Sequence, residues 1–193
     1  MLARLSLWLL LLAAGPAGHA AAQDQLLEQA AGRFAILPAN SEIAFQVPAV
    51  GGPGIVGRFT DFSGEFVIDR RDVARSAVTL AIRPGSAVTA QERVSRFIRG
   101  PAVFDAERFP QATFRSTAVS RTGPRTAIVE GVLTAKGISR PIRLNATLLS
   151  LRGRQAAFEV AGEFPRSWFG MAAGVPLYRD IVRLSVIATG SRR

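Results

Sequence analysis

The stretch Phe158-Glu-Val-Ala-Gly-Glu-Phe164 indicates a β-strand, because its apolar residues recur at every second position. This period places Phe158, Val160 and Phe164 on one face and Glu159 and Glu163 on the other, as in a strand between a core and water. The same alternation recurs at residues 43–47, 62–68, 78–82, 114–118, 128–132, 142–148 and 182–186. Two further short strands are expected near residues 34–37 and 55–59. About eight to ten strands at hairpin spacing predict an antiparallel barrel or sandwich.

One segment departs from this period and predicts a short helix near residues 89–100. Thr89-Ala-Gln-Glu92 fits a capping box, in which the two end side chains satisfy the first free amides of a helix. Gly100-Pro101 would end the helix after about three turns. The segment also carries an apolar stripe at i, i+3, i+4 spacing, formed by Val94, Phe97 and Ile98.

Three arginines fall on the side of this helix away from the stripe: Arg93, Arg96 and Arg99. They fit a solvated basic face on a helix that lies over the sheet. They also fit a site for an anionic headgroup, because guanidinium pairs bidentately with phosphate. Arg93 and Arg96 are therefore the headgroup candidates.

The composition limits the chemistry available to the chain. The 193 residues contain no cysteine and one histidine, His19, and 48% of them are apolar, enough for the core of one domain. Without cysteine there are no disulfides, thiolate metal sites or cysteine nucleophiles. The formal charge is +10, and Lys136 is the single lysine.

Residues 1–22 have the three-part pattern of a secretory signal peptide. Arg4 is followed by an apolar run from Leu5 to Ala14, a Gly-Pro break, and small residues with Ala20 and Ala22 as a cleavage site. The run is too short for a transmembrane helix, which needs about 20 apolar residues. We expect a mature domain at residues 23–193, with no integral membrane segment.

Cleavage after residue 22 would remove Arg4 and His19, which lowers the charge to +9 and leaves neither histidine nor cysteine. A Ser-His-Asp triad or a histidine-ligated metal or haem cannot be built from such a chain. We therefore expect no catalytic residues, no metal and no cofactor. Carboxylates, Tyr178 and Lys136 remain available for acid–base chemistry, so an enzyme is disfavoured rather than excluded.

Four segments, in order along the chain, resemble the YceI family of lipocalin-like, polyisoprenoid-binding proteins. Ser41–Val47 and Ile55–Phe66 resemble its opening strands, and the remaining matches are Phe104–Ser116, Gly131–Ile142, and Phe164–Met171 leading to Asp180. Family members often carry histidines after the first strands and near the helix start. This chain has other residues at those places.

The resemblance implies an antiparallel, lipocalin-like barrel of about eight strands with an apolar tunnel for an isoprenoid, quinone or fatty-acyl lipid. Binding such a lipid requires no catalytic group. We expect a periplasmic or secreted location, and the sequence leaves open whether the chain forms a homodimer. Arg166 and Asp180 are expected to form a structural pair. Nine residues are predicted to line the tunnel, although ordinary core packing fits each of them as well: Ile43, Phe45, Phe66, Val78, Leu80, Phe97, Phe114, Phe158 and Trp168.

Other functions fit the sequence less well. Arginines scattered evenly along an exported chain do not form a nucleic-acid-binding stripe, so no nucleic acid is expected. One tyrosine and two tryptophans are too few for the aromatic girdles of an outer-membrane barrel. A hydrolase that uses carboxylates, and a structural or stress-related barrel without a ligand, remain the alternatives.

Overall fold

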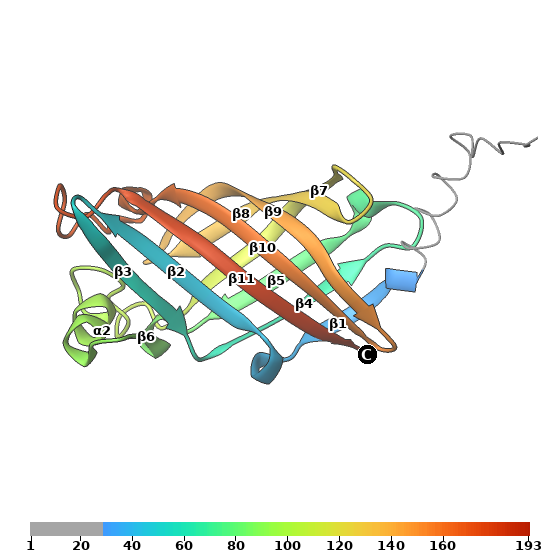
Figure 1. The fold of residues 1–193 in the computed structure, drawn as a ribbon, viewed down its shortest axis with the longest axis horizontal. Helices are drawn as coiled ribbons and strands as arrows, with labels where there is room; N and C mark the ends of the chain where they lie inside the picture. Colours follow the sequence, from blue (N-terminus) through green and yellow to red (C-terminus); the bar gives the residue numbers. More distant parts are fainter. Residues whose placement is uncertain (1–28) are drawn as a thin grey trace, which may run out of the picture.

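The computed structural model describes residues 29–193, so the predicted signal peptide at residues 1–22 lies outside the described residues. The fold is built almost entirely from strands (Figure 1). No helix in the described part of the chain is long and apolar enough to span a membrane. The strands are β1 Gly32–Ile36, β2 Glu42–Ala49, β3 Gly52–Phe59, β4 Phe62–Ile68, β5 Ala77–Ile82, β6 Ala87–Thr89, β7 Ala112–Arg121, β8 Thr126–Ala135, β9 Ile138–Arg152, β10 Gln155–Pro165 and β11 Ile181–Arg192. The helical elements are α2 Glu92–Arg99 and the 3-10 turns η1 Pro38–Asn40, η2 Val73–Arg75, η3 Pro84–Ser86 and η4 Arg166–Phe169.

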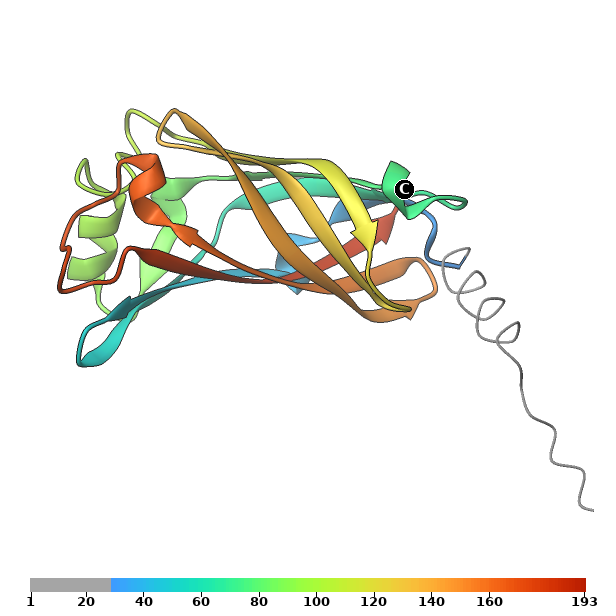
Figure 2. The same cartoon turned by 90° about the horizontal axis from the view of Figure 1, so that it is seen from above.

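Eight strands close into an antiparallel barrel, as predicted. Their order is β1-β4-β5-β7-β8-β9-β10-β11, and pairing of β11 with β1 closes the ring. The C-terminal part of β11 pairs with β1 through Ile36 and Gly190, whereas its earlier part pairs with β2 through Phe45 and Leu184. Strands β2, β3 and β6 thus extend the sheet at one end of the barrel, where α2 also lies (Figures 1 and 2).

Clusters of phenylalanine rings pack inside the barrel, supplied by the inward-facing positions of its strands. One cluster contains Phe34 and Phe66, which stack with centroids 4.9 Å apart, and Phe158, whose ring meets that of Phe66 edge-on at 5.3 Å. At the α2 end, Phe59 packs against Phe45 at 5.2 Å and Phe104 at 5.5 Å. Offset and edge-on ring pairs of this kind stabilise a core beyond the burial of their area.

The helix is shorter than predicted, and the capping box is absent. Helix α2 begins at Glu92 with Gln91 at its N-cap, and no side chain caps it there. Thr89 Oγ1 instead donates to the carbonyl of Gln91 at 2.9 Å, and Glu92 pairs with Arg99. Strand β6 accounts for the difference, because it occupies residues up to Thr89 by pairing with β3.

Gly131 on β8 lies where the barrel wall has no room for a side chain. A Cβ atom there would lie 2.5 Å from the Phe114 ring and 2.6 Å from the carbonyl oxygen of Arg115. We expect Gly131→Ala to lower the free energy of unfolding by about 1–3 kcal/mol, the usual effect of overpacking, as measured by urea denaturation. Gly52→Ala is the matched control, because nothing lies within 4 Å of a Cβ at that position. Equal stability of the two variants would contradict the prediction.

Candidate ligand-binding site

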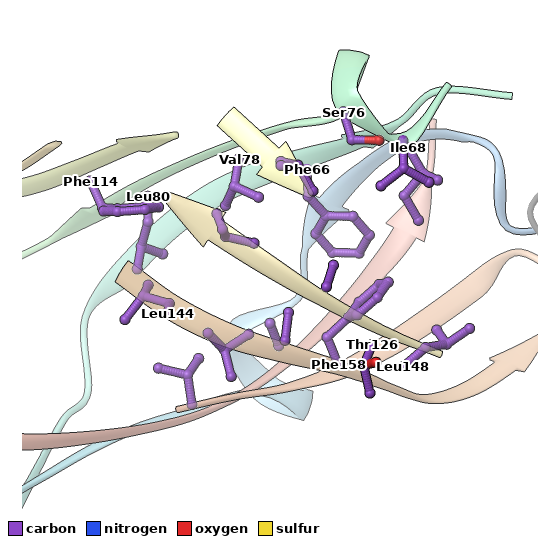
Figure 3. Close-up of a pocket in the computed structure, with 18 of the residues that line it drawn as sticks. Phe66, Ile68, Ser76, Val78, Leu80, Phe114, Thr126, Leu144, Leu148 and Phe158 are labelled. Carbon is purple, nitrogen blue, oxygen red and sulfur yellow. The ribbon is translucent and has the colours of Figure 1, made fainter. Parts of the chain in front are cut away.

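A first cavity of about 210 Å³ occupies the half of the barrel nearer β1. Its wall carries side chains from β4, β5 and β7–β11, and Figure 3 shows Phe66 and Phe158 facing each other within it. Polar side chains such as Ser76 and Thr126 enter only at its rim, near η2 and the β7–β8 hairpin. Alternation along the strands produces this lining, since every second side chain of a barrel strand points inward.

A second cavity of about 220 Å³ occupies the α2 end of the barrel. Phe45, Phe59 and Phe104 contribute to its wall, and Phe97 of α2 reaches its rim. Phe97 is 52% exposed, so the cavity meets solvent beside α2. Its lining is apolar except near Arg166 and Tyr178.

The two cavities share three wall residues, Ile82, Leu133 and Leu184. We call these three side chains the neck, because they border both cavities. All three are aliphatic, and Leu133 and Leu184 are only partly buried by protein. The barrel therefore contains two apolar cavities that adjoin at the neck.

Most of the residues predicted to line a tunnel lie on these walls. Phe45 and Phe97 line the second cavity. The first cavity is lined by Phe66, Val78, Leu80, Phe114 and Phe158. These residues come from five strands and one helix and meet only because the sheet closes.

The other two predicted residues, Ile43 and Trp168, are not in the lining of either cavity. Ile43 is 1% exposed and packs in the core cluster of Phe59, Phe62 and Val186, which leaves it no surface on a cavity. Trp168 belongs to η4, beyond the end of the alternating strand β10, and its side chain is 42% exposed.

The sequence alone did not single out the neck or Arg166 as parts of the site. Leu184 belongs to the alternating segment at residues 182–186, so the sequence did predict that its side chain faces the barrel interior. Nothing in that pattern separates a neck residue from its neighbours. The sequence does not predict that Arg166 is buried, because charged residues are almost never buried unless they are paired.

The headgroup candidates Arg93 and Arg96 lie on the exposed side of α2, outside the lining of either cavity. Arg99 is tied to Glu92 by an ion pair on the same helix. Within the predicted stripe, Ile98 is buried, whereas Phe97 turns half outward. Arg93 and Arg96 thus lie on the same helix as Phe97 and Ile98, which line the second cavity, but outside that lining.

A buried serine holds α2 in place. Ser95 is fully buried, and its Oγ accepts a hydrogen bond from the backbone N–H of Thr89 at 2.8 Å. The same oxygen donates to the carbonyl of Gln91 at 3.3 Å. These bonds connect the helix to β6 and so position the rim of the second cavity.

We expect Ser95→Ala to lower the free energy of unfolding by about 1–2 kcal/mol, because it leaves the partly buried N–H of Thr89 without an acceptor. Chemical denaturation followed by circular dichroism measures the effect. Ser139→Ala is the control, since Ser139 bonds Thr134 Oγ1 at 2.7 Å on the exposed surface. A Ser95 variant as stable as this control would show that the bonds to Thr89 and Gln91 contribute nothing.

The charged residues in the described linings are arginines: Arg121 and Arg125 at the first cavity and the buried Arg166 at the second. At the first cavity, Arg125 donates to the carbonyl oxygens of Leu148 and Leu149 at 2.8 and 2.7 Å, which closes the β7–β8 hairpin against β9. In the turn before η2, backbone hydrogen bonds from Arg71 and Asp72 hold the pKa of Asp69 below its ordinary value.

The described cavity walls carry Tyr178 at the second cavity but no carboxylate. Neither aspartate nor glutamate occurs among the described residues that line the two cavities. Residues 29–193 also hold no group of three histidine, cysteine or carboxylate side chains placed to bind a metal ion. The interior as described can enclose an apolar group and offers it few polar contacts.

A closed antiparallel barrel with an apolar two-chambered interior and a short helix at one end defines the class as a lipocalin-like barrel. Residues 34–189 match the sequence model of the YceI-like domain. The chain belongs to the YceI-like family. A UPF0312 protein of Photorhabdus laumondii is 31% identical over 136 residues, which cover 68% of this chain and 70% of that protein. A UPF0312 protein of Shewanella baltica is 28% identical over 160 residues, covering 80% and 84%.

Solved structures share the fold. Burkholderia cenocepacia BcnA superposes with a TM-score of 0.74 at 24% identity, over 80% of this chain and 98% of that one. The Campylobacter jejuni YCEI protein gives 0.69 at 19% identity, over 76% and 90%. A polyisoprenoid binding domain from Saccharophagus degradans gives 0.66 at 14% identity, over 83% and 98%.

Proposed function

We propose that this chain is an exported, non-enzymatic carrier that binds a long apolar lipid, isoprenoid, quinone or fatty-acyl, inside its barrel. The observation that carries this proposal is the pair of apolar cavities that meet at the neck. At about 210 and 220 Å³, each exceeds the roughly 150 Å³ of an engineered apolar cavity that stays dry and binds benzene. An unbranched or isoprenoid chain is the shape that fits two chambers in series.

The energetics favour such a ligand. Each CH₂ group transferred from water to an apolar wall contributes about 0.8 kcal/mol. Ten buried carbons would therefore contribute about 8 kcal/mol before the costs of association are subtracted. A lipid can therefore bind with useful affinity without polar contacts, as expected for cavities with mainly apolar linings.

Two further observations support a carrier over a hydrolase. The described cavity walls lack carboxylates, which were the main groups left for acid–base catalysis. One protein of the same fold is described as a polyisoprenoid binding domain implicated in plant cell wall breakdown. Export to the periplasm is part of the proposal and rests on the sequence of residues 1–22.

Mass spectrometry of organic extracts tests the proposal, with protein expressed with its leader and purified natively without detergent. We expect one class of long-chain lipid at close to one molecule per chain, and an N-terminus at Gln23. Repeated recovery of an empty barrel would refute the carrier function and favour a barrel without a ligand. Turnover of an added lipid or amide that is lost on replacing a carboxylate would instead indicate an enzyme.

A further inference from the structure

Two loops at the α2 end of the barrel join to form an exposed apolar edge. The backbone N–H of Val50, in the β2–β3 turn, donates to the carbonyl of Leu177 at 2.9 Å, and that of Arg179 donates to Pro48 at 2.8 Å. A bridge between Ala49 and Tyr178 lies between these bonds. The β2–β3 turn and the segment before β11 are therefore one structural unit (Figures 1 and 2).

This unit presents large apolar side chains to solvent. Val50, Val175 and Leu177 are 59%, 50% and 61% exposed, and we call these three residues the apolar lip. Residues 47–57 and 167–178 contain no charged side chain, although 20% of the whole chain is charged. Contiguous exposed apolar groups without charge mark an interaction surface.

The lip borders the mouth of the second cavity. Gly174 and Tyr178, from the same segment as the lip, line that cavity, and so does the half-exposed Phe97 of α2. The cavity therefore reaches the surface between the lip and α2. Arg93 and Arg96 lie exposed on α2 beside it.

From this arrangement we propose that the lip, Phe97, Arg93 and Arg96 form a docking face for an anionic lipid bilayer. The inference rests on the proposed carrier function, since it names the surface across which the lipid enters and leaves. Apolar side chains that project from loops insert among acyl chains, while arginines beside them pair with headgroup phosphates. Two features fit this face to an anionic bilayer. The exposed arginines Arg93 and Arg96 can pair with its phosphates, and the uncharged lip lies at the mouth of the second cavity.

Vesicle flotation of the mature protein tests the docking face. Vesicles of phosphatidylglycerol and phosphatidylcholine in equal parts are expected to retain the chain about tenfold better than vesicles of phosphatidylcholine alone, because each arginine near an anionic surface adds to the attraction. Val50→Asp/Leu177→Asp should abolish flotation on both. Arg93→Glu/Arg96→Glu should remove the preference for anionic vesicles.

Matched controls carry the same changes on the barrel wall. Val132→Asp/Leu149→Asp alters two apolar side chains that are 36% and 45% exposed, and Arg115→Glu/Arg140→Glu reverses two exposed arginines. Both controls should float like the unaltered chain. A loss of flotation in the controls as large as in the face variants would overturn the assignment. So would a dimer that dissociates in Val50→Asp/Leu177→Asp, since the lip would then belong to a second copy.

The bound lipid of each variant, measured by mass spectrometry, separates this inference from the proposed function. Variants that keep their lipid but no longer float support the docking face. Unaltered protein that carries lipid and does not float refutes the face and leaves the carrier function standing. Unaltered protein that floats through the lip yet is always empty refutes the carrier function instead.

Discussion

Replacing Arg166 by methionine is expected to lower the free energy of unfolding by roughly 3–5 kcal/mol. Arg166 is 6% exposed and is the only buried charged residue among those that the structure describes. A methionine fills similar volume and donates no hydrogen bond. The change therefore isolates what the guanidinium contributes.

The guanidinium organises the segment between η4 and β11. Nε donates to the carbonyl of Arg179 at 3.0 Å, Nη1 to those of Met171 and Ala173 at 2.5 and 2.8 Å, and Nη2 to that of Tyr178 at 3.2 Å. A partly or fully buried carbonyl without a donor costs about 1–3 kcal/mol, and this substitution leaves four carbonyls without one. We also expect the variant to lose its affinity for vesicles, because the same segment carries Val175 and Leu177 of the lip.

Guanidine denaturation of the purified variants measures this effect. Arg179→Met is the matched control, because Arg179 is the neighbouring exposed arginine, and it should change stability by less than about 0.5 kcal/mol. Arg166→Lys should fall between them, since an ammonium cannot reach four acceptors in the plane of a guanidinium. An Arg166→Met variant as stable as Arg179→Met would show that the carbonyls are satisfied in another way.

The role of Arg166 could not be predicted correctly from the sequence. The expected pairing of Arg166 with Asp180 is wrong, because the Asp180 carboxylate accepts hydrogen bonds from the backbone N–H and the hydroxyl of Ser167. Arg166 meets Asp180 only through the backbone, its N–H donating to the Asp180 carbonyl at 3.2 Å. The sequence suggests a pair only because the two side chains carry opposite charges. The four carbonyl oxygens that Arg166 actually binds come together only when the segment folds, so the sequence could not show them.

The strands themselves were predictable for a physical reason. Alternation identifies a long strand wherever one face is buried, as at Phe158–Phe164, and the structure places β10 there. Strand β6 has only three residues, too few to show a period, and it forms because β3 offers an edge. Closure through β1 and β11 depends on residues about 155 positions apart, such as Ile36 and Gly190, which no local pattern connects.

The cavity walls were predictable only in part. Ile43 and Phe45 both face inward on β2, but Ile43 is packed by neighbouring side chains while Phe45 borders open volume. Inward orientation follows from the two-residue period. Whether an inward side chain meets a partner or a void depends on the summed volumes of side chains from several strands. A cavity is thus a property of the closed barrel rather than of any one segment.

The neck gives the second large expected effect. On the proposed function, one lipid chain occupies both cavities and crosses the neck. Leu133→Trp should then lower the affinity for a long-chain lipid by about a hundredfold or more, because the indole would fill the space where the two cavities adjoin. A chain confined to one cavity loses several buried CH₂ groups at about 0.8 kcal/mol each, and three such groups alone account for about fiftyfold. Short ligands that fit one cavity should bind nearly unchanged.

Displacement of a fluorescent long-chain fatty acid, compared with a short-chain analogue, measures this selectivity. Val132→Trp is the matched control, because it makes the same kind of change at the adjacent, outward-facing position of β8. Leu184→Trp places an indole in the neck from β11 and should repeat the effect if the Leu133 variant folds poorly. Equal loss of long and short ligands would mean that the two cavities do not act as one path. Unchanged binding of both would mean that the ligand does not cross the neck.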